Sequence, residues 1–253
     1  MEAAVPVWRT QHFLADTDAD FAQRLKLSSA FGFFQDISAA HASNLGGDVE
    51  WLRDELGVAW ILMRMRVEVT KYPRIRDTIT VETWPQKPRA LYERDYVIYD
   101  AEENSLMRAA STWIIMNLKD RSIVREKILD YRGAEMWTKR SLGRSLGKLR
   151  PVSGAAPVFE KLIGYSDVDY NGHLNNARHV DFIMDSIPFS EHKKREIRAL
   201  EINYLNELVP GDTLELRRAA DPADEAVSHF EGVRKEDGES VILADIEWAD
   251  RTE

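Results

Sequence analysis

The sequence predicts an α+β protein built from two similar halves, and three observations support this. Strand-like alternation of apolar and polar side chains fills most of both halves, and each half contains one long helix-like stretch. The landmarks Asp77-Thr78 and Trp113 recur as Asp212-Thr213 and Trp248, each 135 residues later. A fixed offset at two landmarks indicates an internal duplication, so each half is expected to form one structural unit.

The strands follow from the alternating segments, which typify half-buried antiparallel strands joined by short turns. The first half contains four such segments, at residues 58–73, 77–84, 90–100 and 106–120. The second half repeats them at residues 199–210, 212–219, 226–238 and 240–250.

One helix is expected in each half, at residues 28–47 and 175–188. Ser28 or Ser29 is the candidate cap of the first helix, and the Gly46-Gly47 pair ends it. Pro188 stops the second. Both are apolar over more than a narrow stripe, which is typical of a helix surrounded by protein. Each half is therefore predicted to be an antiparallel sheet wrapped around a central helix.

A basic segment separates the halves. "WTKRSLGRSLGKLRP", residues 137–151, has five lysines and arginines, no acid and no clear periodicity. The predicted organisation is an N-terminal unit over residues 1–136, a linker over 137–156 and a C-terminal unit over 157–253.

Composition excludes several classes of function. The chain of 253 residues has no cysteine, which rules out disulfides, thiolate metal sites and a cysteine nucleophile. A net charge of −9 argues against nonspecific nucleic-acid binding. No run is long enough for a membrane span, and the first residues lack the pattern of a signal peptide, so a cytoplasmic location is expected.

The most informative stretch is "YSDVDYNGHLNNARHVDF", residues 165–182. From Asp167 it matches the first half of an EF-hand calcium loop, with oxygen ligands at loop positions 1, 3 and 5 and glycine at position 6. The twelfth position is Arg178, where the ion needs a bidentate glutamate. A cation there repels the metal, so a calcium site is disfavoured.

A second motif, "GRSLG" at residues 143–147, spells the G-x-S-x-G nucleophile elbow of α/β hydrolases. That elbow needs a buried strand before the serine and a helix after it. The flanks of Ser145 are basic and broken, which disfavours Ser145 as a nucleophile.

The third interpretation is an active site. Asp169, Asn171 and His173 recur at every second residue, so in an extended chain they project from one face just before a helix. The helix N-terminus offers free N–H groups, and histidine moves protons at neutral pH. The alternative is a polar turn in which Asn175 or Asn176 simply caps the helix.

The stretch "DVDYNGHLNNARHVDFIMD" resembles the acyl-acyl-carrier-protein thioesterases of plants and bacteria, which are tandem double hotdog proteins. "VWRTQHFLADTD", "LMRMRVEV", "RAASTWIIMNL" and "INYLNELVPGD" extend the resemblance over nearly the whole chain. It implies hydrolysis of long-chain acyl thioesters of acyl-carrier protein, which releases free fatty acid and ends chain elongation.

The resemblance places the active site at Asp169, Asn171 and His173, with Glu207 as an acid from the following strand. Glu207 and His173 are expected to activate or orient water, Asn171 to position that water or the thioester carbonyl, and Asp169 to orient its neighbours. A cysteine often follows the acid in plant members, but this chain has Leu208. The first half has no Asn-x-His before its helix.

By the same resemblance the N-terminal half houses the acyl chain. The candidate lining residues are Phe31, Phe34, Trp60, Met63 and Met65, each of which could equally be ordinary core. The carrier protein is acidic, so basic residues are candidates for docking it. They are Lys139, Arg140, Arg144 and Lys148 in the linker or, alternatively, Arg64, Arg66, Lys71, Arg74 and Arg76.

Three other functions remain open from sequence: an acyl-CoA thioesterase, another hotdog enzyme such as a hydratase, and a noncatalytic acyl-binding protein. No cofactor and no metal is expected. A double hotdog provides internally the pairing that single hotdogs obtain by dimerising, so both a monomer and a homodimer are compatible with the sequence.

Overall fold

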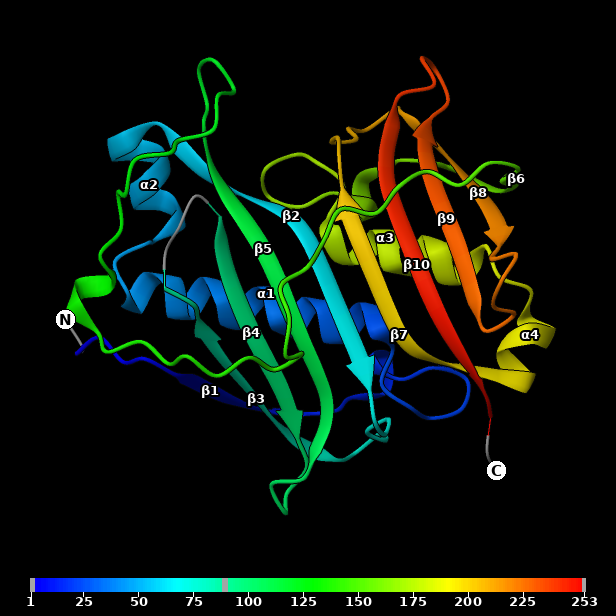
Figure 1. Ribbon diagram of the computed structural model, residues 1–253, viewed down its shortest axis with the longest axis horizontal. Coiled ribbons are helices and arrows are strands. Elements are labelled where there is room, and N and C mark those ends of the chain that lie inside the picture. Colours follow the sequence, from blue (N-terminus) through cyan, green and yellow to red (C-terminus); the bar gives the residue numbers. More distant parts are fainter. Residues whose placement is uncertain (1–2, 88–90, 252–253) are drawn as a thin grey trace. The chain divides into compact units, whose positions relative to one another are not determined.

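The computed structural model describes residues 3–87 and 91–251, and the chain divides between Leu146 and Gly147 into two compact units. The N-terminal unit contains β1 (Trp8–Phe13), α1 (Leu27–Asn44), α2 (Val49–Leu56), β2 (Val58–Val69), β3 (Thr78–Pro85), β4 (Tyr92–Tyr99) and β5 (Ser105–Asn117) (Figure 1). The C-terminal unit contains β6 (Ala156–Leu162), α3 (Asn176–Asp185), α4 (Phe189–Lys194), β7 (Arg195–Tyr204), β8 (Thr213–Ala220), β9 (Val227–Arg234) and β10 (Ser240–Asp250).

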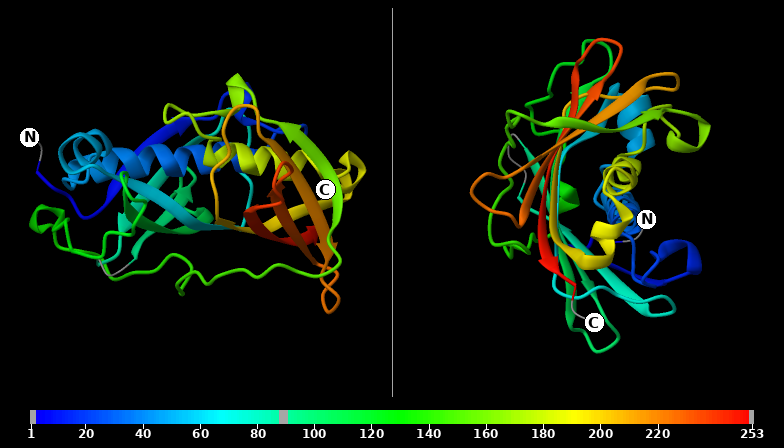
Figure 2. Two further views of the ribbon diagram at one scale, coloured as in Figure 1. Left: turned by 90° about the horizontal axis from the view of Figure 1, so that it is seen from above. Right: turned by 90° about the vertical axis from the view of Figure 1, so that its right-hand side faces the viewer.

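Each unit has five antiparallel strands. A central helix lies on one face of them, as Figures 1 and 2 show. The strand order is β1-β3-β4-β5-β2 in the N-terminal unit and β7-β10-β9-β8-β6 in the C-terminal unit. The predicted α+β class and the strand segments of both halves are confirmed, except that the start of the 90–100 segment, Ala90, lies outside the described residues.

The central helices are held by apolar side chains at helical spacing. Leu27, Phe31, Phe34 and Ile37 of α1 are all 5% exposed or less. In α3 the buried positions include Val180 and Ile183. Residues spaced three or four apart fall on one helix face, so both helices bury that face in their own unit.

The predicted serine cap of α1 is wrong. The helix begins at Leu27 with Lys26 as its N-cap residue, and Ser28 is buried inside the first turn. Lys26 takes this place because its backbone is extended and its carbonyl accepts the first helical hydrogen bond, from the Ala30 N–H at 3.1 Å. The preceding loop, and not a capping side chain, sets where the helix starts.

Sequence reasoning also missed β1, α2 and α4. The signals for α2 are present, because Asp48 accepts N–H bonds from Glu50 and Trp51 at its start and Gly57 ends it with a left-handed φ of 63°. Pro188 follows α3, which ends at Asp185, and is the N-cap residue of α4.

The N-terminal core contains a buried histidine, His41 of α1, and a buried arginine, Arg94 of β4. The Arg94 guanidinium donates to His41 Nδ1 at 3.0 Å, and because guanidinium can only donate, His41 Nε2–H donates to the Val5 carbonyl at 2.8 Å. His41 is therefore neutral. Burial, reinforced by the charge of Arg94, lowers the pKa of His41 from 6.5 to about 4.

This depressed pKa predicts a loss of stability in mild acid. The folded chain binds fewer protons at His41 than the unfolded chain, so the free energy of unfolding falls as the pH drops from 6.5 towards 4. The loss attributable to His41 is expected to reach about 3 kcal/mol. Urea titrations at both pH values should show a smaller loss in His41→Gln, whose amide can accept and donate in the same places. Burial also lowers the pKa of His179, to about 3, but His179 is present in the wild type and in His41→Gln. The difference between their losses of unfolding free energy therefore reports on His41. Equal losses in both proteins would contradict the assignment.

The described helices include none that is both long and apolar enough to cross a membrane.

Candidate active site

The candidate site is a tight loop that leads into α3. A single 3₁₀ turn, Tyr165–Asp167, is followed by a loop closed by the antiparallel bridge Val168↔Leu174. Inside it the Asp169 N–H donates to the His173 carbonyl at 2.9 Å. Gly172 has a left-handed φ of 79°, which the tight reversal requires and which glycine adopts without strain.

This loop corrects the extended-chain argument for the three polar residues. Asp169, Asn171 and His173 do not share a face by strand alternation, because the chain reverses between Asp169 and His173. The loop itself brings them together. Asp169 Oδ1 accepts the Asn171 N–H at 2.8 Å, and Asp169 Oδ2 lies 3.4 Å from the Asn171 amide nitrogen. Asp169 thus fixes Asn171 from both its backbone and its side chain.

The structure brings His173 and Glu207 together from segments 34 residues apart in sequence. His173 Nδ1 lies 3.8 Å from Glu207 Oε1, and the two side chains are 39% and 33% exposed. That distance is too long for a direct hydrogen bond and short enough for one water to contact both groups. Solvent can therefore reach an imidazole and a carboxyl group at a single point.

Backbone contacts hold the two segments in this register. The Leu174 N–H, next to His173, donates to the carbonyl of Leu208, next to Glu207, at 2.8 Å. Arg234 donates to the Glu207 carbonyl at 2.9 Å, and the Tyr204 hydroxyl donates to the Asn176 carbonyl at 3.1 Å. Sequence reasoning missed Arg234 and Tyr204, since nothing local in the sequence links either to the loop.

Asn175 has the capping role that the alternative interpretation gave it, because its side chain accepts the Ala177 N–H at 2.8 Å. Asp167, 1% exposed, accepts from the Gly164 N–H and contacts Lys161 and Arg178. Asp167, the first ligand position of the supposed calcium loop, is thus already paired with two cationic side chains. Among the residues that the structure describes, no group of three or more histidines and acids could hold a metal.

The five candidate acyl-chain residues lie in the N-terminal unit but do not form one group. Phe31 and Phe34 project from α1, and Phe34 packs on Tyr96 with ring centroids 4.9 Å apart. Trp60, Met63 and Met65 belong to β2. Trp60 is set apart, because it donates to the Gly47 carbonyl and packs against a cluster near α2 that includes Leu45 and Leu52.

The four linker cations proposed for carrier docking have unequal surroundings. Arg140 is paired with Glu93 at 2.6 Å, and Lys139 lies over the Trp84 ring at 5.6 Å. Arg144 and Lys148 are exposed. The linker residues up to Leu146 thus belong to the N-terminal unit.

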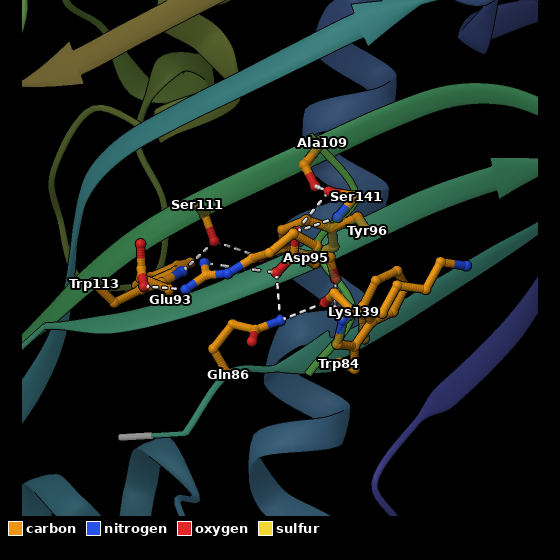
Figure 3. A network of polar contacts seen from close by, with 12 residues as sticks. Trp84, Gln86, Glu93, Asp95, Tyr96, Ala109, Ser111, Trp113, Lys139 and Ser141 are labelled. Atoms are coloured by element: carbon orange, nitrogen blue, oxygen red, sulfur yellow. Dashed lines mark hydrogen bonds and ion pairs between the residues drawn. The ribbon is translucent and has the colours of Figure 1, made fainter. Parts of the chain in front are cut away.

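Ser141 anchors this part of the linker to the buried Asp95 (Figure 3). The Ser141 N–H donates to Asp95 at 2.7 Å, its hydroxyl lies 2.7 Å from the same oxygen, and Gln86 donates at 2.8 Å. The Lys139 carbonyl accepts from Trp84 and Gln86. Tyr96, the next residue of β4, contacts α1 through Ser38, so Asp95 and the linker lie on the opposite face of the sheet.

Comparison with known families matches both units. The description of the acyl-ACP thioesterase N-terminal domain fits residues 6–130, and that of the C-terminal domain fits residues 160–250. The chain belongs to the acyl-ACP thioesterase family. The resemblance seen in the sequence is thereby confirmed, and with it the double hotdog fold.

Curated members of the acyl-ACP thioesterase family include two from Cuphea viscosissima. The chain is 28% identical over 243 residues to the chloroplastic acyl-[acyl-carrier-protein] hydrolase FATB3, covering 88% of this chain and 57% of that protein. It is 30% identical over 199 residues to FATB2, covering 75% of this chain and 48% of that protein. The chain thus spans about half the length of the curated relatives it matches.

Solved structures of the family share the fold along the whole chain. An acyl-ACP thioesterase from Bacteroides thetaiotaomicron superposes with a TM-score of 0.87 at 24% identity, over 96% of this chain and 98% of the other. A 12:0-ACP thioesterase from Umbellularia californica gives 0.82 at 20% identity, over 99% and 100%. Leu208, the position at which the resemblance to plant members led us to expect a cysteine, is fully buried.

Proposed function

We propose that the chain hydrolyses long-chain acyl thioesters of acyl-carrier protein, releasing the free fatty acid and ending chain elongation. The observation that supports this best is the approach of His173 to Glu207 beside the Asp169–Asn171 pair. Two groups that can accept a proton and an amide, around one point that solvent reaches, are what water attack on a carbonyl requires.

In the proposed reaction His173 and Glu207 hold a water and accept its proton as the oxygen attacks the thioester carbonyl carbon. The amide of Asn171 positions the water or the carbonyl oxygen, and Asp169 holds that amide in place. The C–S bond then breaks, and the sulfur leaves as a thiol with the proton that the His173–Glu207 pair took from the water. Such a positioned base contributes about 10² to 10⁴ in rate.

The alternative route forms an acyl-enzyme on Glu207 before water attacks. A single turnover in isotopically labelled water distinguishes the routes. Direct attack places the label only in the fatty acid. Hydrolysis of an acyl-enzyme at the Glu207 carbonyl places the label in Glu207. Hydrolysis at the acyl carbonyl labels the fatty acid as direct attack does, and it is recognised instead by an acylated Glu207 peptide, detected by mass spectrometry after rapid quench.

The function itself is tested with a panel of acyl-carrier-protein thioesters of varied chain length, beside acyl-CoA and enoyl thioesters. Free fatty acid is expected from the carrier thioesters, with a lower KM than for the matching acyl-CoA. Equal or better kinetics on acyl-CoA would indicate an acyl-CoA thioesterase. Water addition to the enoyl thioester without hydrolysis would indicate a hydratase, and bound fatty acid without turnover a noncatalytic binding protein.

The proposed partner is the acidic acyl-carrier protein, and the proposed assembly is a monomer or homodimer, which sedimentation would distinguish. The cytoplasmic location stays a prediction, since the curated relatives are named chloroplastic. Cell fractionation with an antibody to the chain would test it.

A further inference from the structure

The N-terminal unit contains a second copy of the catalytic junction. Its loop before α1 repeats the loop before α3 with an offset of 149 residues. The 3₁₀ turn Asp16–Asp18 corresponds to Tyr165–Asp167, and the bridge Ala19↔Leu25 corresponds to Val168↔Leu174. Gln23 even keeps the left-handed φ, 59°, of its counterpart Gly172. The two loops therefore have one backbone form.

The hydrogen bonds of the two copies also correspond. The Asp20 N–H donates to the Arg24 carbonyl, as the Asp169 N–H does to His173. The Leu25 N–H donates to the Pro73 carbonyl, as the Leu174 N–H does to Leu208. Pro73 precedes Leu208 by the 135-residue offset of the strands, so Tyr72 stands where the C-terminal unit has Glu207.

Of the four proposed catalytic side chains, the second copy keeps only the counterpart of Asp169, which is Asp20. Ala22, Arg24 and Tyr72 occupy the places of Asn171, His173 and Glu207. The guanidinium of Arg24 lies 4.4 Å from the centre of the Tyr72 ring, where the other copy has its histidine and carboxylate. This arrangement provides neither a base nor an acid for water attack, so the loop is free to serve another purpose.

Charge is what most distinguishes the two copies. Residues 14–26 and 71–77 of the N-terminal copy contain five basic residues, Arg24, Lys26, Lys71, Arg74 and Arg76. The matching residues 163–175 and 206–212 contain no lysine or arginine, although both copies contain four acids. The cations are therefore specific to the N-terminal copy.

Three of the four acids in the N-terminal copy are explained by the fold. Asp18, Asp20 and Asp77 each accept a backbone N–H within their own turn. Their counterparts Asp167, Asp169 and Asp212 accept the equivalent N–H groups in the other copy. These carboxylates belong to the shared turn geometry. Of the added cations, Lys26 donates to the Thr17 carbonyl and Arg24 pairs with Asp20, which leaves Lys71, Arg74 and Arg76.

Three of these cations are available to bind another molecule. Lys71, Arg74 and Arg76 are exposed, and within residues 3–87 and 91–251 no carboxylate forms an ion pair with their side chains. Lys71 also interacts electrostatically with Asp100. Exposed apolar rings flank the group, with Phe13 64% and Phe21 48% exposed. The main chains join here, since the Arg76 N–H donates to the Leu14 carbonyl next to Phe13, and the Ile75 N–H to Gln23.

We propose that this basic junction, formed by Lys71, Arg74 and Arg76 with Phe13 and Phe21, is the surface on which the acidic carrier protein docks. The inference rests on the proposed function, since that function supplies the acidic partner. Exposed cations without an ion-pair contact, beside exposed apolar rings, match a partner that presents carboxylates around an apolar contact, because local fields steer association even on a chain of net charge −9.

The test compares carrier-bound and small thioesters with the same acyl group. In the triple variant Lys71→Gln/Arg74→Gln/Arg76→Gln, KM for the acyl-carrier protein is expected to rise at least about tenfold, because three steering charges are lost. Its kcat, and kcat/KM for the N-acetylcysteamine thioester, should not change. Added salt should raise KM for the carrier less in the variant than in the wild type.

Two matched triple variants serve as controls. Lys119→Gln/Arg125→Gln/Lys127→Gln removes three exposed cations elsewhere in the same unit and should leave KM unchanged. Lys139→Gln/Arg144→Gln/Lys148→Gln tests the linker, and a larger effect there than at the basic junction would overturn the proposal. Thermal melts check folding, and Arg74→Gln alone replaces the triple variant if that variant unfolds.

The two hypotheses fail in different ways. If the wild-type chain hydrolyses no thioester, the proposed function is wrong. If the wild type hydrolyses the carrier thioester and the triple variant keeps its KM, the function stands and the docking surface is wrong.

Discussion

Glu207→Gln is expected to lower kcat for acyl-thioester hydrolysis by about 10² to 10⁴, because the amide cannot accept the proton of the attacking water. His173→Ala should have an effect of the same size, since both side chains contact the proposed water from either side of a 3.8 Å separation. Initial rates of fatty acid release measure both. The effects are not expected to multiply in the double variant, because the two groups act as one unit.

Both variants should fold, since the two side chains are partly exposed and their loop is held by backbone bonds. Glu160→Gln is the matched control, because it neutralises another glutamate of the C-terminal unit, in an exposed pair with Lys235. It should keep full activity, as exposed ion pairs contribute about 0–1 kcal/mol. Full activity in Glu207→Gln and His173→Ala would rule out the proposed site.

Asp95→Ala is expected to lower the free energy of unfolding by about 3 kcal/mol, because it leaves buried donors without an acceptor. The donors are the Ser141 N–H and one N–H of the Gln86 amide, whereas the Ser141 hydroxyl keeps an acceptor in the Ala109 carbonyl, 2.6 Å away (Figure 3). Burial raises the pKa of Asp95, while the hydrogen bonds from Ser141 and Gln86 oppose that rise. These bonds are therefore what makes a buried carboxylate tolerable at this position.

Urea unfolding measures this loss, and Arg53→Gln is its control. The Arg53–Asp54 pair of the same unit is exposed, so its loss should cost less than about 1 kcal/mol. Limited proteolysis gives a second readout, because the linker near Ser141 should be cut faster in Asp95→Ala. Equal unfolding free energies in Asp95→Ala and wild type would show that the Asp95 network does not hold the linker.

The sequence predicted the elements whose apolar side chains recur with a clear period. It did not predict features that are set by backbone geometry. The strands and both central helices followed from side-chain alternation and helical spacing. The start of α1 did not, because Lys26 is the N-cap residue through its backbone alone. No propensity favours lysine over the serines that follow it.

For the candidate site, the loop residues were visible in sequence because they cluster, whereas Glu207 was reached only through family resemblance. Its pairing with His173 is long-range and depends on the Leu174–Leu208 backbone bond. The argument that brought Asp169 and His173 together was wrong, because it assumed an extended chain where Gly172 reverses it. Arg234 was missed because it contacts the site through a carbonyl, which leaves no trace in a side-chain pattern.

The two junction loops show how the function of side chains can change after duplication of a unit. Because Gln23 keeps the backbone form that Gly172 has, the loop does not depend on the reactive side chains it displays. The side chains of the loop can then be substituted while its backbone conformation is kept. One copy could retain a reaction while its twin acquired a different recognition role, and neither change needed a new fold.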